Sequence, residues 1–365
     1  MKSAEMQRAL LAWYRRSRRD LPWRRTDDPY AIWLSETMLQ QTRVDTVLPY
    51  YRRFLEALPT VRALAEAPES RVLSLWSGLG YYRRARMLHA AARRVIREHR
   101  GEVPRDVEGL RGLEGVGEYT AGAVASIAYG VRAALVDGNV VRVLSRLFAV
   151  EEDASTGAGK ARFWGLARDL VSSAPGDPGD WNQALMELGA TVCSPRGPAC
   201  DGCPVRSFCV ARARGLVDEL PRSSSKRPPR EVRRVALVLV SADPGRVLLA
   251  RRRPGVLFGG LWEPPSIDGA ADAAGRLAER LGVDASTLEP RGEVRHVLTH
   301  RRMHVTVLRG PLPAKRRWPV PGPDYDAARA IATADLGDIA HATLTRKVLS
   351  LANAAARGVR SRSSP

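Results

Sequence analysis

The stretch CSPRGPACDGCPVRSFC, residues 193–209, contains every cysteine of this chain, in the spacing Cys193-x6-Cys200-x2-Cys203-x5-Cys209. Four thiolates complete the ligand set of one iron–sulfur cubane or of one tetrahedral zinc ion. No cysteine is left over to pair elsewhere, so the four act as one set. The prolines and glycines between them predict a tight, irregular wrap around a bound metal centre.

Two other uses of the four cysteines stay open at this point. Two disulfides fit poorly, because we find no secretory signal and the chain is larger than the small secreted domains that depend on disulfides. Zinc usually takes two short Cys-x2–4-Cys pairs, and only Cys200 and Cys203 form such a pair here. Free thiols that bind metal predict a reducing, cytoplasmic location.

Composition and charge narrow the class of partner. The chain has 365 residues, of which 44% are hydrophobic, so it is long enough for two or three folded domains. A formal charge of +19 favours polyanions, and nucleic acid first among them. Nearly all the basic residues are arginines, which also fits a bias in composition. The N-terminus has no continuous apolar core and no segment approaches a membrane span, so we expect neither a signal peptide nor a membrane protein.

The pattern of apolar residues divides the chain into a mainly α part and a small α+β part. Apolar side chains recur every three and four residues over 1–212, which predicts helices joined by short Pro- and Gly-rich turns. Residues 213–231 include PRSSSKRPPRE and predict a linker. Residues 232–352 carry strand-like runs and one helix at 271–282, beginning with a β-hairpin around DPG. Residues 353–365 are small and basic and predict a frayed tail.

The segment LRGLEGVGEYTAGAVASIAYG, residues 110–130, predicts two helices joined by a turn that contains Gly115 and Gly117. Glycines allow a sharp turn and a close approach to a ligand, and the N–H groups at the start of the second helix, near Glu118, suit a phosphate. Such turns are common in proteins of many functions. In a strongly basic chain this helix-hairpin-helix favours DNA binding.

Two carboxylates stand in positions that favour chemistry. Asp137 comes just before a helix with an apolar face, where it is expected to cap the helix and to stay ionised. Glu36 lies in WLSETMLQQT, where helical spacing places it near the buried edge. A carboxyl group in an apolar pocket has a raised pKa, which suits a general acid. The structural alternatives are a simple helix cap for Asp137 and a solvated helical glutamate for Glu36.

Taken together, these motifs resemble the endonuclease III superfamily of DNA glycosylases, and within it the MutY family. The cysteine spacing resembles the loop that holds a 4Fe–4S cluster there, and VDGNV resembles the catalytic aspartate motif. WLSETMLQQT resembles the adenine pocket. The resemblance, from about residue 8 to about residue 350, implies that Glu36 protonates the adenine ring nitrogen. It implies that Asp137, with Asn139 as a polar neighbour, faces the sugar cation.

Tyr119 decides between branches of the superfamily. Endonuclease III-type enzymes carry a lysine at the equivalent position, and its amine forms a Schiff base with the sugar. This chain has Tyr119 there and no lysine between Lys2 and Lys160. We therefore predict a monofunctional glycosylase. The alternatives are an endonuclease III-like enzyme acting on another mismatched or oxidised base, a Nudix nucleotide hydrolase, and a DNA-binding module without activity.

Further residues take roles from the resemblance alone. It implies that Trp23 and Arg24 border the adenine pocket, with Glu187 nearby. Gln41 would fill space on the opposite strand. Leu79 and Tyr81, in GLGYYRRAR, would wedge into the duplex and help to flip the target base.

The C-terminal part resembles the Nudix-like domain of the MutY family. Of the acidic metal-binding box only Glu279 remains, and Arg276 and Arg280 stand where glutamates bind metal, so we expect recognition and not hydrolysis. The family reads 8-oxoguanine through a Phe-Ser-His loop, and the residues here are Leu298, Thr299 and His300. The implied partner is duplex DNA with adenine opposite 8-oxoguanine or guanine. We expect a cytoplasmic monomer, associated with the nucleoid if the source is a bacterium.

Overall fold

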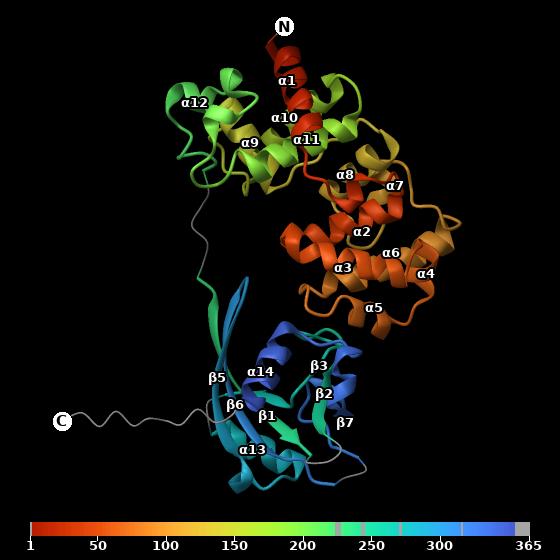
Figure 1. Ribbon diagram of the computed structural model, residues 1–365, viewed down its shortest axis with the longest axis vertical. Helices are drawn as coiled ribbons and strands as arrows, with labels where there is room; N and C mark the ends of the chain where they lie inside the picture. Colours follow the sequence, from red (N-terminus) through yellow and green to blue (C-terminus); the bar gives the residue numbers. More distant parts are fainter. Residues whose placement is uncertain (1, 223–227, 242–244, 270–271, 315–316, 355–365) are drawn as a thin grey trace, which may run out of the picture. The chain divides into compact units, whose positions relative to one another are not determined.

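The computed structural model describes residues 2–222, 228–241, 245–269, 272–314 and 317–354. The chain divides into two compact units (Figure 1). The helical unit comprises Met1–Ala67 and Met87–Lys226, and the sheet unit comprises Pro68–Arg86 and Arg227–Pro365. The sequence predicts one helical part over 1–212, but residues 68–86 belong with the C-terminal residues.

The first unit is built from helices, as the apolar spacing predicts. Helix α6, Arg83–Glu98, begins in the segment of the sheet unit and continues into the helical unit. The other helices of the helical unit are α1 (Lys2–Ser17), α2 (Pro29–Leu39), α3 (Val44–Ala57), α4 (Val61–Glu66), α7 (Val107–Arg111), α8 (Glu118–Tyr129), α9 (Gly138–Phe148), α10 (Gly157–Ser173), α11 (Pro178–Thr191) and α12 (Val210–Arg214). A short 3-10 helix, η1, spans Pro22–Arg24.

Side-chain caps fix where the two most informative helices begin. Asp28 accepts a hydrogen bond from the Tyr30 amide at 3.0 Å, and a proline occupies the first turn of α2. Asp137 accepts a hydrogen bond from the Val140 amide at 2.7 Å and is the N-cap of α9. The predicted cap at Asp137 and the predicted start of the second hairpin helix at Glu118 are both confirmed.

One hydrophobic core joins α1, α9, α10 and α11. Its largest side chains include Tyr14, Phe163 and Trp181, all buried. Cys193, Cys203 and Cys209 are half-buried and pack against the same core. The cysteine loop is therefore attached to the helices that follow Asp137.

The sheet unit holds a seven-stranded sheet with the order β3-β2-β1-β6-β5, in which β4 pairs with β1 and β7 with β2. Strands β1 and β6 are parallel, and the other pairs are antiparallel. The strands are β1 (Arg230–Val240), β2 (Arg246–Arg252), β3 (Trp262–Glu263), β4 (Ser266–Asp268), β5 (Glu289–Leu298), β6 (Arg301–Pro311) and β7 (Tyr325–Ala332). The helices are α5 (Glu69–Leu75), α13 (Ala273–Leu281) and α14 (Thr343–Asn353).

Helices α13 and α14 pack on this sheet, α13 against β1 and β4 and α14 against β5, β6 and β1 (Figure 1). Strand β1 begins at Arg230, so the predicted linker, 213–231, was placed slightly too long. Residues 223–227 of that linker and 355–365 of the predicted tail lie outside the described residues. Within the described residues, no helix combines the length and apolar character that crossing a bilayer requires.

The close approach of α8 to the chain before Asp137 gives the first prediction. A Cβ atom on Gly122 of α8 would overlap the Ala134 carbonyl oxygen, a backbone atom that cannot move away cheaply. We expect Gly122→Ala to destabilise the protein by about 1–3 kcal/mol, as overpacking does. A Cβ atom on Gly165 of α10 would meet nothing within 4 Å, so Gly165→Ala should stabilise by about 0.5–1 kcal/mol. Urea unfolding of both variants tests this, and equal effects would contradict it.

Candidate active site

A cleft of about 970 Å³ in the helical unit gathers most of the residues that the sequence singled out. It is lined by parts of η1, α2, α8 and α11 and by the start of α9. The predicted site residues that line it are Trp23, Arg24, Glu36, Gln41, Gly115, Gly117, Tyr119, Asp137, Asn139 and Glu187. Residues spread over more than 160 positions of sequence thus face one space.

Glu36 is buried, at 5% exposure, on a helix whose residues Tyr30 to Met38 are all buried. The Tyr119 hydroxyl donates a hydrogen bond of 2.6 Å to Glu36 Oε2. Burial, assisted by the nearby Asp137 charge, raises the pKa of Glu36 to about 7, while the Tyr119 hydrogen bond and Arg24 oppose the rise. A carboxyl group with this pKa can hold and release a proton at neutral pH.

Asp137 is half-buried at the N-terminus of α9, and both of its oxygens accept hydrogen bonds. Oδ1 accepts from the Val140 amide at 2.7 Å, and Oδ2 accepts from Asn139 Nδ2 at 2.8 Å. Burial nevertheless raises the pKa of Asp137, although these bonds and Arg142 act to lower it. The helix terminus alone predicts a lowered pKa for Asp137, but the cost of burial reverses the direction.

Arg142, which the sequence analysis did not select, links Asp137 to the cysteine loop. Its Nη2 donates to Asn139 Oδ1 at 2.8 Å, and its Nε donates to the Cys193 carbonyl at 2.6 Å. Asn139 in turn donates to Asp137. The orientation of the Asp137 carboxyl group is therefore tied to the first residue of the cysteine loop.

Glu187 is fully buried and holds η1 in place through ion pairs. Arg19 and Arg24 each donate to it, with Nη2–Oε2 distances of 2.8 Å. Burial alone would raise its pKa, but the hydrogen bonds from the two arginines lower the pKa to about 2. Trp23, between the arginines in sequence, contacts Tyr51 edge-to-face with a centroid distance of 5.2 Å. The pairing identifies Arg19 as a further site residue.

The turn of the helix-hairpin-helix requires its first glycine. Gly115 has φ +77°, and a Cβ atom there would lie 2.7 Å from Met87 Cβ. Gly117 is the N-cap of α8. Glu114 lies 3.9 Å from Arg94, measured from Oε1 to Nη1, so its carboxylate is directed toward a cation.

The four cysteines line a separate small pocket, together with Arg146. Arg146 is buried and donates to Cys193 Sγ at 3.4 Å and to the Leu220 carbonyl at 2.9 Å. Burial raises the pKa of the Cys203 thiol to about 11 and also raises that of Cys209. In the described part of the chain, no three His, Cys, Asp or Glu side chains are close enough to hold a single metal ion. The four thiols line one pocket, and four thiolates are the donor set that one iron–sulfur cluster or one zinc ion takes.

The remaining predicted site residues belong to the sheet unit. Leu79 is buried and Tyr81 is 47% exposed, so of the two predicted wedge residues only Tyr81 presents its side chain to solvent. Thr299 and His300 form the exposed turn between β5 and β6, next to a half-buried Leu298. Strands β5 and β6 flank this turn.

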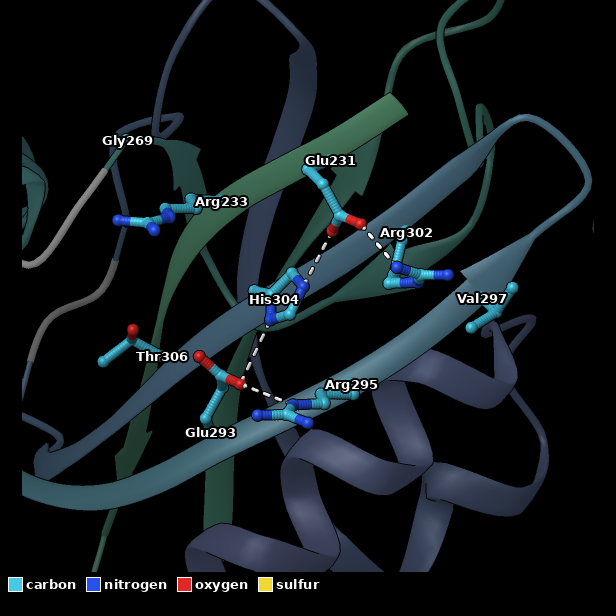
Figure 2. A pocket seen from close by; sticks show the side chains of 9 residues that line it. All are labelled: Glu231, Arg233, Gly269, Glu293, Arg295, Val297, Arg302, His304 and Thr306. Atoms are coloured by element: carbon cyan, nitrogen blue, oxygen red, sulfur yellow. Dashed lines mark hydrogen bonds and ion pairs between the residues drawn. The ribbon is translucent and has the colours of Figure 1, made fainter. Parts of the chain in front are cut away.

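Strands β1, β5 and β6 also form a charged hollow in the sheet unit (Figure 2). Figure 2 shows His304 between two carboxylates, with its Nε2 2.9 Å from Glu231 and its Nδ1 3.2 Å from Glu293. Arg302 and Arg295 pair with the same two carboxylates at 2.7 and 3.1 Å. The charges in this hollow are therefore largely matched by one another, and such exposed pairs contribute little energy.

Two different protein families match the N-terminal and the C-terminal part of the chain. Residues 34–168 match the family model of the HhH-GPD superfamily base excision DNA repair protein, and residues 235–351 match the NUDIX domain. A relative in Rattus norvegicus named adenine DNA glycosylase is 39% identical over 86% of this chain and 72% of its own length. One of the same name in Schizosaccharomyces pombe is 35% identical over 80% of this chain and 79% of its own length.

The chain belongs to the adenine DNA glycosylase family. The match to the Homo sapiens member is 42% identical and spans 71% of this chain but only 57% of that protein. Among solved structures, a thermostable thymine-DNA glycosylase is similar, with 33% identity and a TM-score of 0.53, over 58% of this chain and 97% of that chain. This chain combines a helical glycosylase fold with a C-terminal Nudix-like domain, and both predictions from the sequence are confirmed.

The ion pairs of Glu187 give a prediction with a defined pH dependence. The pKa of Glu187 in the folded protein, about 2, lies below its ordinary value of 4.5. The ion pairs of Glu187 therefore stabilise the fold above pH 4.5, and this stabilisation is lost as the pH falls toward 2. At pH 7 we expect Glu187→Gln to lose about 3 kcal/mol of stability, because Arg24 keeps its charge without its buried partner. The difference from wild type should shrink below about pH 4.5.

Asp20 provides the matched control, since it pairs with Arg25 in a solvent-exposed position. Asp20→Asn should change the free energy of unfolding little at any pH. Urea unfolding at pH 7 and at about pH 3 measures both variants. Equal losses in Glu187→Gln at the two pH values would contradict the predicted ionic role.

Proposed function

We propose that this protein hydrolyses the N-glycosidic bond of adenine in duplex DNA and leaves the strand intact. The observation that carries the proposal is that Glu36, with a pKa of about 7, and Asp137 line the same cleft. Removing a base requires a proton donor to the leaving group and a negative charge beside the sugar cation. The two carboxyl groups supply one of each, and relatives in the family carry the name adenine DNA glycosylase.

In this proposal Glu36 is the general acid. Tyr119 donates to Oε2, so Glu36 carries its proton on the other oxygen, Oε1, and gives it to a ring nitrogen of the flipped adenine. A protonated base is a far better leaving group. The phenol of Tyr119 keeps the carboxyl group in one orientation and replaces the nucleophilic amine that a Schiff-base enzyme needs. The abasic product strand is therefore not cut.

Asp137 stabilises the cation that forms as the base leaves. Its two oxygens are held by the Val140 amide and by Asn139, so the carboxylate needs no reorientation when positive charge develops. Water then adds to the sugar carbon, and the proton that it loses passes to the Glu36 carboxylate, which restores the acid. Arg142 positions Asn139 and also lowers the pKa of Asp137 through its charge.

DNA would be held at several parts of the helical unit. We assign the phosphate contact to the glycine turn with Gly115 and Gly117 at the start of α8. Trp23 and Arg24 would border the base, and Gln41, exposed after α2, would reach the opposite strand. The net charge of +19 favours this partner at long range.

We further propose that adenine is excised opposite 8-oxoguanine or guanine, and that the turn of the sheet unit reads the opposite base. In 8-oxoguanine a ring nitrogen that accepts in guanine carries a proton. The Thr299 hydroxyl can accept a hydrogen bond from it. Thr299 and His300 are exposed at the end of a hairpin, where a duplex can reach them.

We infer that the cysteine loop holds a 4Fe–4S cluster through Cys193, Cys200, Cys203 and Cys209. The four thiols surround one pocket, and Arg146 places a positive charge against Cys193, which suits an anionic cluster–thiolate assembly. The cluster would organise the loop and, through Arg142, support the start of α9. The alternative is a zinc ion bound by the same four thiols.

Two conservative substitutions test the proposed reaction. Glu36→Gln removes the acid and Asp137→Asn removes the charge, while both keep the shape of the cleft. We expect both variants to bind mismatched duplex and to lose at least about 100-fold in single-turnover excision of adenine. Tyr129→Phe, which alters a hydrogen bond to the Val103 carbonyl outside the cleft, is the control. Excision near the wild-type rate in either variant would remove that residue from the mechanism.

A panel of duplexes tests the substrate. The panel pairs adenine with 8-oxoguanine, guanine or cytosine, thymine with guanine, and thymine glycol with adenine. We expect excision of adenine opposite 8-oxoguanine and guanine, and strand breaks only after alkali. Thymine removal from the guanine mispair would instead favour the specificity of the similar thymine-DNA glycosylase.

Metal content tests the cofactor. Protein purified without oxygen should contain about four irons and four sulfides per chain and absorb broadly in the visible range. Stoichiometric zinc without iron would decide for the alternative. Cys200→Ser should leave the loop without a complete ligand set and give poorly soluble protein.

A further inference from the structure

Three arginines line the active-site cleft, Arg19, Arg24 and Arg43, and their charges are compensated to different degrees. Arg19 and Arg24 each form an ion pair of 2.8 Å with the buried Glu187. Arg43 is exposed, and its side chain makes no hydrogen bond or ion pair within the described part of the chain. The guanidinium of Arg43 is therefore available to an anion that enters the cleft.

The carboxylate nearest to Arg43 in the sequence, Asp45, does not pair with it. Asp45 is exposed and lines the same cleft, and among the described residues the two side chains form no ion pair. Asp45 acts on Arg19 instead: the hydrogen bond to Glu187 raises the pKa of Arg19, and the charges of Glu187 and Asp45 add to the rise. All the N–H donors of the Arg43 side chain therefore remain unused in the free protein.

The backbone of Arg43 is held in place, whereas its side chain has no part in holding the fold. Helix α2 ends at Leu39 and α3 begins at Val44, with Gln41 between them at φ +56°. Arg43 is the N-cap residue of α3, and its carbonyl accepts a hydrogen bond from the Val47 amide at 3.0 Å. Its side chain makes no capping hydrogen bond. A substitution of Arg43 should therefore leave the start of α3 intact.

We propose that Arg43 binds a backbone phosphate of the DNA strand opposite adenine. The inference rests on the proposed binding of duplex DNA and on the proposed reach of Gln41 to the opposite strand. Gln41 and Arg43 are two residues apart, so their Cα atoms lie within about 7 Å of each other. A guanidinium can donate two parallel N–H bonds to one phosphate. Such a contact positions the strand and carries no information about the bases.

The salt dependence of binding tests for the charge contact. The probe is a duplex with a non-cleavable adenine analogue opposite guanine, titrated at salt concentrations from about 50 to 200 mM. We expect Arg43→Gln to weaken binding by about threefold to tenfold. The slope of log association constant against log salt should become shallower by about 0.9, the loss of one phosphate contact. Arg43→Lys keeps the charge and should keep the wild-type slope. Arg168→Gln, which removes an exposed arginine of α10 outside the cleft, is the control and should change neither quantity.

Neutral methylphosphonates, placed one at a time in each strand around the mispair, identify the phosphate. At one position of the opposite strand the replacement should weaken binding of the wild type and have no further effect on Arg43→Gln. A wild-type salt slope in Arg43→Gln would overturn the inference. Coupling of Arg43 only to a phosphate of the adenine strand would overturn it as well. Wild-type protein that binds these duplexes but excises no adenine from cleavable ones would contradict the proposed reaction alone, because both tests of Arg43 measure binding.

Discussion

The hydrogen bond from Tyr119 to Glu36 is the interaction on which the cleft depends. It joins α2 and α8 across 83 positions of sequence and holds a carboxyl group that burial keeps partly protonated at neutral pH. Both helices must be close for this bond to form. Gly122 permits α8 to approach the chain that leads into Asp137, so the same helix positions both carboxyl groups.

Charge is arranged around this pair in a consistent way. Arg19 and Arg24 are matched by the buried Glu187, so neither adds an uncompensated positive charge beside Glu36. Asp137 is held by neutral donors, while Arg142 bonds to Asn139 and acts on Asp137 through its charge. Glu36 therefore keeps a raised pKa, whereas Glu187, also buried, is driven to a pKa of about 2 by direct pairing. The pKa values of the two glutamates therefore differ because Glu187 contacts cations directly, although both side chains are buried.

Local features of the fold and of the cleft could be predicted from the sequence. The cap at Asp137, the glycine turn and the burial of Glu36 follow from residue type and helical spacing over a few turns. Arg19, Arg142 and Arg146 could not be selected from among so many arginines, because their partners lie far away in the sequence. That residues 68–86 belong to the sheet unit could not be predicted for the same reason, because it depends on hydrogen bonds with His341 and Thr343. Leu79, predicted as a wedge from resemblance alone, is buried.

The protonation of Glu36 is the central claim, and the pH profile of single-turnover adenine excision tests it most directly. The acid form is required, so the rate should fall as the pH rises through about 7, by about tenfold for each further pH unit. Asp137→Glu, which keeps a carboxylate at the other position, should retain the same descending limb at a lower rate. A rate that stays constant from about pH 6 to about pH 9, and that exceeds the rate of Glu36→Gln at both ends of this range, would contradict the account.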